Sequence, residues 1–243
     1  MKIIGKFQGG SFAYGLSTPE SDLDYRWVFL HTDFSKIIGL NKQDHDAAAN
    51  EESNDNFGYE LRFFLKLLQK GNSQATELLW NTNWIQKTPE FDLIQSHKFK
   101  LMDSEKLFRM LLGYINGEKR IITGQNTGKL GEKRKVQLEK FGYSFRNVVH
   151  ALRLLRTGIL FFKYNIYPVN IVEQDKDYGK FILDVKTNPQ NHKVDNLIRL
   201  IENQEQELKE TFDTRYLNHK FDIDVANEIC YSLYIPILNK QNI

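Results

Sequence analysis

The chain has 243 residues and a mass of 28.6 kDa, enough for one large domain or two small ones with a sizeable core. A hydrophobic fraction of 41%, a charged fraction of 26% and a mean hydropathy of −0.50 exclude a disordered, fibrous or membrane-spanning chain. The 33 basic and 31 acidic residues leave a net charge of +2, so charge alone demands no polyanionic partner. Lys6 interrupts any apolar signal region near the N-terminus, and we expect a cytoplasmic protein without a membrane partner. The single cysteine, Cys230, excludes an intrachain disulfide and is predicted to be a buried thiol.

The first part of the chain predicts strands that alternate with helices. A strand is expected over residues 2–8, and a short helix follows the glycine turn at Ser11. Residues 22–30 are rich in aromatic and β-branched side chains and predict a second strand. Residues 55–59 predict a third strand, which runs into an amphipathic helix that ends at Gly71.

The remainder of the chain predicts mainly helices. Further helices are expected at residues 74–80, 89–97, 103–117, 141–163, 197–208 and 225–233, with a short strand at 180–185. Residues 118–140 contain seven basic side chains and three acidic ones, and this excess of positive charge indicates a basic connector. We therefore expect a core domain over residues 1–118, a connector over 119–140 and a helical C-terminal domain over 141–243.

Two short motifs near the N-terminus carry chemistry. Asp22 and Asp24 are two residues apart on a predicted strand, so their carboxylates point to the same face and repel each other. A shared Mg²⁺ ion relieves such repulsion, and Mg²⁺ also binds the phosphate oxygens of a substrate. The turn at Gly10 and Ser11 offers backbone N–H groups and a hydroxyl to a phosphate. Each motif alone is common in solvated turns. Together they predict a phosphate-binding turn that faces a metal-binding pair of carboxylates.

These motifs resemble the signature of the nucleotidyltransferase superfamily with the DNA polymerase beta fold. That signature is a Gly-Ser turn, an Asp-x-Asp strand and a third acidic residue on a later strand. Residues 10–26 further resemble the Gly-Ser-x-Ala-Tyr-Gly and Ser-Asp-x-Asp-x-Arg pattern of a bacterial and phage family of predicted nucleotidyltransferases, some associated with RNA ligases. Residues 59–79 and 141–158 are similar to later segments of that family. The chain departs from it at Ser73, where a proline is common, and at Arg146, where a lysine is usual.

The resemblance implies an α+β fold, with a polymerase-beta-like core built on a small mixed sheet and a mainly helical C-terminal region. It implies two Mg²⁺ ions, with Mn²⁺ as a possible substitute, held by Asp22, Asp24 and Asp55. Glu60 is the alternative third acid, or else a partner of the helix that begins beside it. The expected nucleotide-binding residues are Gly10, Ser11, Tyr14, Arg26, Arg146, His150 and Arg153.

Four polar residues in the predicted helix at 141–163 follow a helical spacing. Arg146, His150, Arg153 and Thr157 are separated by four, three and four residues and form a polar ridge. In a cleft, the arginines would bind phosphate oxygens, and His150 would donate a hydrogen bond or transfer a proton. The alternative interpretation is a solvent-facing helix surface.

These observations predict an enzyme that moves a nucleoside monophosphate from an NTP, such as ATP, to a hydroxyl acceptor. RNA or a tRNA end is the expected acceptor, and a protein hydroxyl is the alternative within the same chemistry. A different class remains open, namely a non-catalytic nucleotide-binding or RNA-binding module, or a toxin–antitoxin partner. The basic residues over 119–135 would either contact a nucleic-acid backbone or form a solvated loop.

Overall fold

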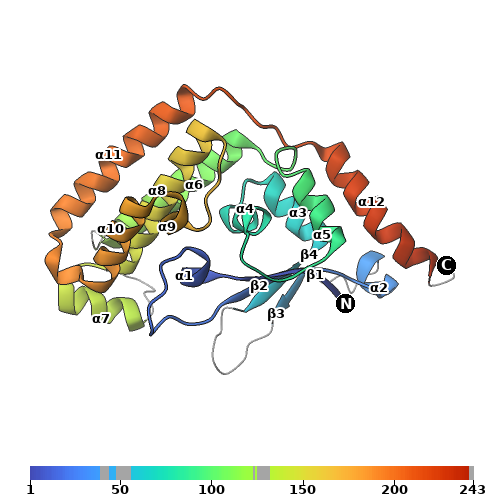
Figure 1. Ribbon diagram of the computed structural model, residues 1–243, viewed down its shortest axis with the longest axis horizontal. Helices are drawn as coiled ribbons and strands as arrows, with labels where there is room; N and C mark the ends of the chain where they lie inside the picture. Colours follow the sequence, from blue (N-terminus) through green and yellow to red (C-terminus); the bar gives the residue numbers. More distant parts are fainter. Residues whose placement is uncertain (39–43, 48–55, 123, 125–131, 241–243) are drawn as a thin grey trace. The chain divides into compact units, whose positions relative to one another are not determined.

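The computed structural model describes the chain except for residues 39–43, 48–55, 123, 125–131 and 241–243 (Figure 1). The chain forms two compact units, Met1–Leu107 together with Asn218–Ile243, and Phe108–Leu217. This division differs from the expected boundaries at residues 118 and 140. Helix α6 (Ser104–Ile122) continues through the first of these positions, and helix α12 (Ile223–Asn239) packs on helices of the first unit.

The first unit is built on a mixed sheet whose described residues form five strands in the order β3-β4-β2-β1-β5. The strands are β1 (Lys2–Gln8), β2 (Tyr25–Leu30), β3 (His45–Ala47), β4 (Phe57–Glu60) and β5 (Trp84–Lys87). Strand β1 lies antiparallel to β2 and β5, β2 is parallel to β4, and β3 is antiparallel to β4. The expected small mixed sheet is confirmed. Strands β3 and β5 escaped prediction because three or four residues show no clear alternation.

The helices of the first unit include one, at residues 34–38, that the sequence did not predict. They are α1 (Gly10–Ala13), α2 (Phe34–Ile38), α3 (Leu61–Gln69), α4 (Ser73–Trp80), α5 (Pro89–Ser96) and α12. Gly71 ends α3 in a left-handed conformation with φ of +70°, while the Asn72 N–H donates to the Leu67 carbonyl at 3.0 Å. The Asn72 side chain then accepts from the Ala75 N–H at 3.0 Å and caps α4. Figure 1 shows α3, α4 and α5 on the same side of the sheet.

The second unit is helical throughout its described residues. It contains most of α6, then α7 (Glu132–Phe141), α8 (Phe145–Tyr164), α9 (Ile171–Gln174), α10 (Lys176–Thr187), the 3₁₀ turn η1 (Pro189–Asn191) and α11 (Val194–Asp213). The strand predicted at 180–185 is wrong, because these residues belong to α10. Asp175 caps that helix at the Tyr178 N–H, and Ile182 and Val185 are buried at helical spacing. Across the described parts of both units, no helix is long and apolar enough to cross a membrane.

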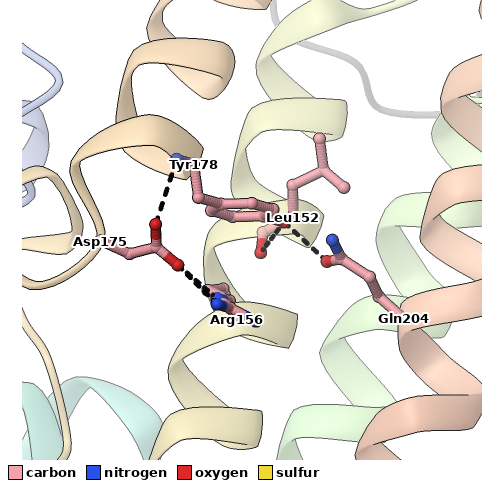
Figure 2. Close-up of polar contacts among 5 residues, drawn as sticks. All are labelled: Leu152, Arg156, Asp175, Tyr178 and Gln204. Atoms are coloured by element: carbon pink, nitrogen blue, oxygen red, sulfur yellow. Dashed lines mark hydrogen bonds and ion pairs between the residues drawn. The ribbon is translucent and has the colours of Figure 1, made fainter.

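A partly buried polar cluster connects three helices of the second unit (Figure 2). The Tyr178 hydroxyl of α10 lies 3.1 Å from the Leu152 carbonyl of α8 and 2.6 Å from Gln204 Oε1 of α11. Arg156 binds the Asp175 carboxylate through Nε at 2.8 Å and Nη2 at 2.5 Å. Burial raises the pKa of Tyr178 far above its usual range, so the hydroxyl stays protonated. The cluster therefore gives α8, α10 and α11 a specific register.

Candidate functional site

The chain leaves β1 through two glycines that lie against the acidic segment before β2. The Gly9 N–H donates to the Asp24 carbonyl at 2.8 Å, one step beyond the pairing of Gln8 with Tyr25. Gly10 has a φ of +59°, and a Cβ built there would lie 2.1 Å from Asp24 Oδ2. Both the backbone conformation and the carboxylate therefore require glycine at this position. The structure brings the predicted phosphate turn and one predicted metal ligand into direct contact.

The two predicted metal ligands precede β2 and do not lie on it. Asp22 is exposed and Asp24 is half-buried, while the strand begins at Tyr25. The expected strand over 22–30 is thus too long, because β1 leaves the sheet at the glycine turn and offers no partner beyond Asp24. A tight turn returns the chain to this segment, since the Ser21 N–H donates to the Thr18 carbonyl at 2.9 Å. The acids therefore lie at an edge that solvent and small ligands can reach.

Two predicted nucleotide-binding residues lie in α1 or directly after it. Ser11 is half-buried within the helix, and its carbonyl accepts from the Leu16 N–H at 2.8 Å. The Tyr14 hydroxyl donates to Glu77 Oε2 at 2.8 Å, and Glu77 is a nearly buried residue of α4. This hydrogen bond connects α1 to the helical layer. Sequence reasoning missed it, because the two residues are 63 positions apart and each has an ordinary local role.

Arg26 and Asn56 define how β4 begins beside β2. The Arg26 guanidinium lies 4.1 Å from the centroid of the Phe57 ring. The Asn56 side chain is buried and accepts from the Tyr25 N–H at 2.7 Å. Asp55, the predicted third metal ligand, directly precedes Asn56 but lies outside the described residues. Asn56 therefore aligns the start of β4 with the end of the acidic segment.

Glu60 is a fully buried carboxylate with donors on several sides. It caps α3 by accepting from the Phe63 N–H at 3.2 Å, and it accepts from Arg62 Nε at 3.0 Å. The Tyr234 hydroxyl of α12 donates to the same carboxylate. The interpretation of Glu60 as a helix-start partner is therefore confirmed. Cys230 is only partly buried, and its burial, together with the charge of Glu60, raises the pKa of this thiol to about 11.

The predicted ridge on α8 does not form one continuous surface. Arg146 is exposed and the His150 side chain is 39% exposed, whereas Arg153 is 2% exposed and Thr157 is fully buried. The Thr157 hydroxyl donates to the Pro168 carbonyl at 3.3 Å. Because α8 packs against α9, α10 and α11, most of its circumference is buried. The ridge thus begins at the surface with Arg146 and His150 and continues into a buried part of α8 with Arg153 and Thr157.

The donor chemistry at the acidic segment suits a hard cation. Asp22 and Asp24 offer carboxylate oxygens, which Mg²⁺ prefers, next to a turn without a Cβ at Gly10. Within the described part of the chain, no group of three His, Cys, Asp or Glu side chains is arranged to hold a metal.

Comparison with known proteins agrees with this geometry. The profile of the RNA repair pathway DNA polymerase beta family matches residues 1–231. The chain is also similar to a protein of Enterobacteria phage T4 described as the uncharacterized 38.9 kDa protein in the nrdC-mobD intergenic region, with 34% identity over 86 residues. That alignment covers 32% of this chain and 26% of the phage protein, so it spans about a quarter of the relative's length. The family profile, in contrast, covers the residues of the turn at Gly10, the acidic segment with Asp24 and the whole helical second unit. The chain belongs to the RNA repair pathway DNA polymerase beta family.

Proposed function

We propose that this protein transfers a nucleoside monophosphate from an NTP to a hydroxyl group of RNA, with a tRNA end included among the acceptors. The contact between the Gly10 backbone and the Asp24 carboxylate carries the proposal, because a turn whose chemistry suits a phosphate then lies beside one of the two acids. Membership in an RNA-repair family of the polymerase beta type supports both the nucleotidyl transfer and the RNA acceptor.

In this proposal Gly10 and Ser11 bind the phosphates of the NTP, and Asp22, Asp24 and Asp55 hold Mg²⁺. The exposed and half-buried positions of Asp22 and Asp24 leave the acidic segment accessible to a cation. When bound, the metal neutralises phosphate charge and lowers the pKa of the acceptor hydroxyl. The protein's own contribution is to hold the phosphate beside the Asp24 carboxylate. This close approach is possible because Gly10 has no Cβ.

Further contacts are proposed for residues with accessible polar groups. Tyr14 and Arg26 flank the turn and the acidic segment in the first unit. In the second unit, Arg146 exposes its side chain and His150 exposes part of its imidazole, so we propose them as phosphate-binding and hydroxyl-binding residues. We assign no direct nucleotide contact to Arg153, because its side chain is buried.

The test is label transfer from each α-labelled NTP, with Mg²⁺ or Mn²⁺, into a mixture of total RNA and host protein. The Asp22→Asn/Asp24→Asn variant is compared with the wild type and with Asp92→Asn. Asp92 is an exposed acid of α5 that binds Lys87 at 2.5 Å and has no place in the proposed site. We expect labelled RNA with the wild type and the control, and a loss of about 100-fold or more with the double variant.

The other outcomes separate the competing functions. Label in protein would replace the RNA acceptor with a protein hydroxyl and indicate an adenylyltransferase. Tight Mg²⁺-NTP binding without any transfer would indicate a binding module. Full transfer by the double variant would refute the role of the two aspartates.

A further inference from the structure

The glycine turn at Gly10 is connected to helix α4 on both of its sides. After the turn, the Tyr14 hydroxyl donates to Glu77 Oε2 at 2.8 Å. Before the turn, Asn81 Nδ2 donates to the Gln8 carbonyl at 3.3 Å. Glu77 belongs to α4 and Asn81 directly follows it, so both contacts come from the C-terminal half of one helix. All of these residues belong to the first unit.

The turn depends on such contacts because its own structure is short. Helix α1 has four residues, and no side chain of Gly9 or its neighbours caps its N-terminus. A single helical turn fixes several backbone dihedral angles in exchange for few hydrogen bonds, so it is marginal by itself. Gly10 also has a φ of +59° and loses much conformational freedom when it is ordered. The turn therefore needs support from outside to keep one conformation.

Helix α4 is itself fixed in the helical layer. The Asn72 side chain caps its first turn, and Ala75 and Leu79 are fully buried. Near its other end, Gln95 Nε2 of α5 donates to the Leu79 carbonyl at 2.9 Å. The position that α4 gives to the turn is therefore set by the packed core of the first unit.

The direction of each hydrogen bond to the turn follows from its surroundings. Glu77 is 8% exposed, and an ionised carboxylate only accepts hydrogen bonds, so the Tyr14 hydroxyl donates. That proton points to Glu77 and not to a phosphate, which also only accepts. Asn81 Oδ1 accepts from the Asn83 N–H at 2.7 Å, and this contact directs Nδ2 to the Gln8 carbonyl.

We propose that Glu77 and Asn81 are positioning residues that keep the turn at Gly10 in the conformation that binds the NTP phosphates. The inference rests on the proposed function and deepens it, because it assigns the Tyr14 hydroxyl to Glu77 and leaves the ring of Tyr14 for a nucleotide contact. When the binding conformation is populated only in part, the apparent affinity for the NTP falls by that fraction. Bound phosphates order the turn themselves, so the two residues act on KM for the NTP and little on kcat.

Hydrogen exchange on the full chain tests the positioning role without nucleotide. The amides of residues 13–16 are hydrogen-bonded within the turn. We expect them to exchange about 5-fold to 20-fold faster in Tyr14→Phe, because the substitution removes one contact with α4. The matched control is Tyr59→Phe, which removes a hydroxyl of β4 that lies 3.4 Å from Gln74 Oε1 of α4. Unchanged exchange in Tyr14→Phe, or equal changes in both variants, would overturn the proposal.

The kinetics of label transfer test the consequence for the NTP. We expect Tyr14→Phe to raise KM for the NTP by about 5-fold to 20-fold, while kcat stays within about 2-fold of the wild type. Asn81→Asp keeps the oxygen that accepts from Asn83 but loses the donor to Gln8, so KM should rise in this variant as well. Tyr59→Phe should leave both constants unchanged. A lower kcat with an unchanged KM in Tyr14→Phe would contradict the inference.

A double-mutant cycle shows whether Tyr14 acts through Glu77. Glu77→Leu removes the acceptor, so we expect Tyr14→Phe/Glu77→Leu to have the same KM as Glu77→Leu alone. Glu77→Gln keeps an acceptor oxygen and should raise KM less than Glu77→Leu does. Single effects that multiply in the double variant would mean that the Tyr14 hydroxyl contacts the NTP directly, and the inference would be wrong.

The outcomes separate this inference from the function on which it rests. A wild-type protein that transfers no label would refute the proposed function, and hydrogen exchange would still decide whether α4 positions the turn. Normal transfer by the wild type, together with an unchanged KM in Tyr14→Phe, would support the proposed function and overturn the inference.

Discussion

The carboxylate of Glu60 and those of Asp22 and Asp24 belong to the first unit and have opposite environments. Glu60, at the end of β4, is fully buried and accepts from a backbone N–H, an arginine and a tyrosine. Asp22 and Asp24, just before β2, are exposed and half-buried beside a glycine turn. A buried carboxylate that is surrounded by donors supports the fold, because removing one donor leaves charge unsatisfied. Carboxylates that solvent reaches, two residues apart in the chain, have the oxygen chemistry that Mg²⁺ prefers.

The largest effect on activity is expected for Asp24→Asn. Replacing this carboxylate by an amide removes charge where the proposed metal binds, so label transfer should fall by about 100-fold or more. The melting temperature should shift by no more than a few degrees, because the side chain is only half-buried. Transfer assays and calorimetry on the same preparation check both expectations. A variant that melts far earlier would instead make Asp24 a structural residue like Glu60.

Gly10→Ala should lower both activity and stability. The left-handed backbone alone costs about 1–2 kcal/mol for a residue with a Cβ, and the new atom must also displace the Asp24 carboxylate. The matched control is Gly142→Ala, where φ is +75° and no atom lies within 4 Å of the added Cβ. Denaturant unfolding should show a larger loss for Gly10→Ala, and label transfer should fall only in that variant. Equal losses of stability would argue against the contact between the turn and the carboxylate.

Tyr234→Phe should destabilise the first unit while leaving catalysis intact. The substitution removes one donor from the buried Glu60 carboxylate, which should lower the free energy of unfolding by about 1–3 kcal/mol. Tyr231→Phe is the control, because Tyr231 lies on the same helix and is exposed. The kcat of the folded variant should equal that of the wild type. A reduced kcat would bring Glu60 into the proposed site and weaken the contrast with Asp22 and Asp24.

The smallest effect is expected at Cys230. Its pKa is raised to about 11 by burial and then by the negative charge of Glu60, so little thiolate is present near pH 8. Glu60→Gln removes that charge, lowers the pKa and should increase the rate of alkylation by iodoacetamide a few-fold. Glu228→Gln, an exposed acid on the same helix, should leave the rate unchanged. A slower reaction in Glu60→Gln would contradict the assigned direction of the charge effect.

Local signals were enough to predict many elements of the first unit. Gly71 and Asn72 were recognised as the end of one helix and the cap of the next, because a left-handed glycine and a capping amide act within one turn. The same locality explains the failure at 180–185, where a short apolar run is compatible with either a strand or a helix. Packing on α8 and capping by Asp175 decide in favour of the helix.

The candidate site was only partly predictable. The motif around Gly10 and Asp24 predicted a phosphate-binding turn next to metal-binding carboxylates, and the structure brings those two residues into contact. Periodicity also grouped Arg153 with His150, but it could not show that Arg153 is buried while His150 reaches the surface. That difference depends on which sides of α8 other helices cover.

The amino-acid sequence by itself determined the class of fold, the ends of some helices in the first unit and the acidic motif, because each of these depends on residues within a few positions of one another. Only the tertiary structure decided the partners of three carboxylates. Glu60 meets Tyr234 across 174 positions, Glu77 meets Tyr14 across 63, and Glu118 meets His150 across 32. A local sequence pattern does not show which residues meet across such separations along the chain. These contacts form when apolar faces of separate elements pack and bring their polar groups together.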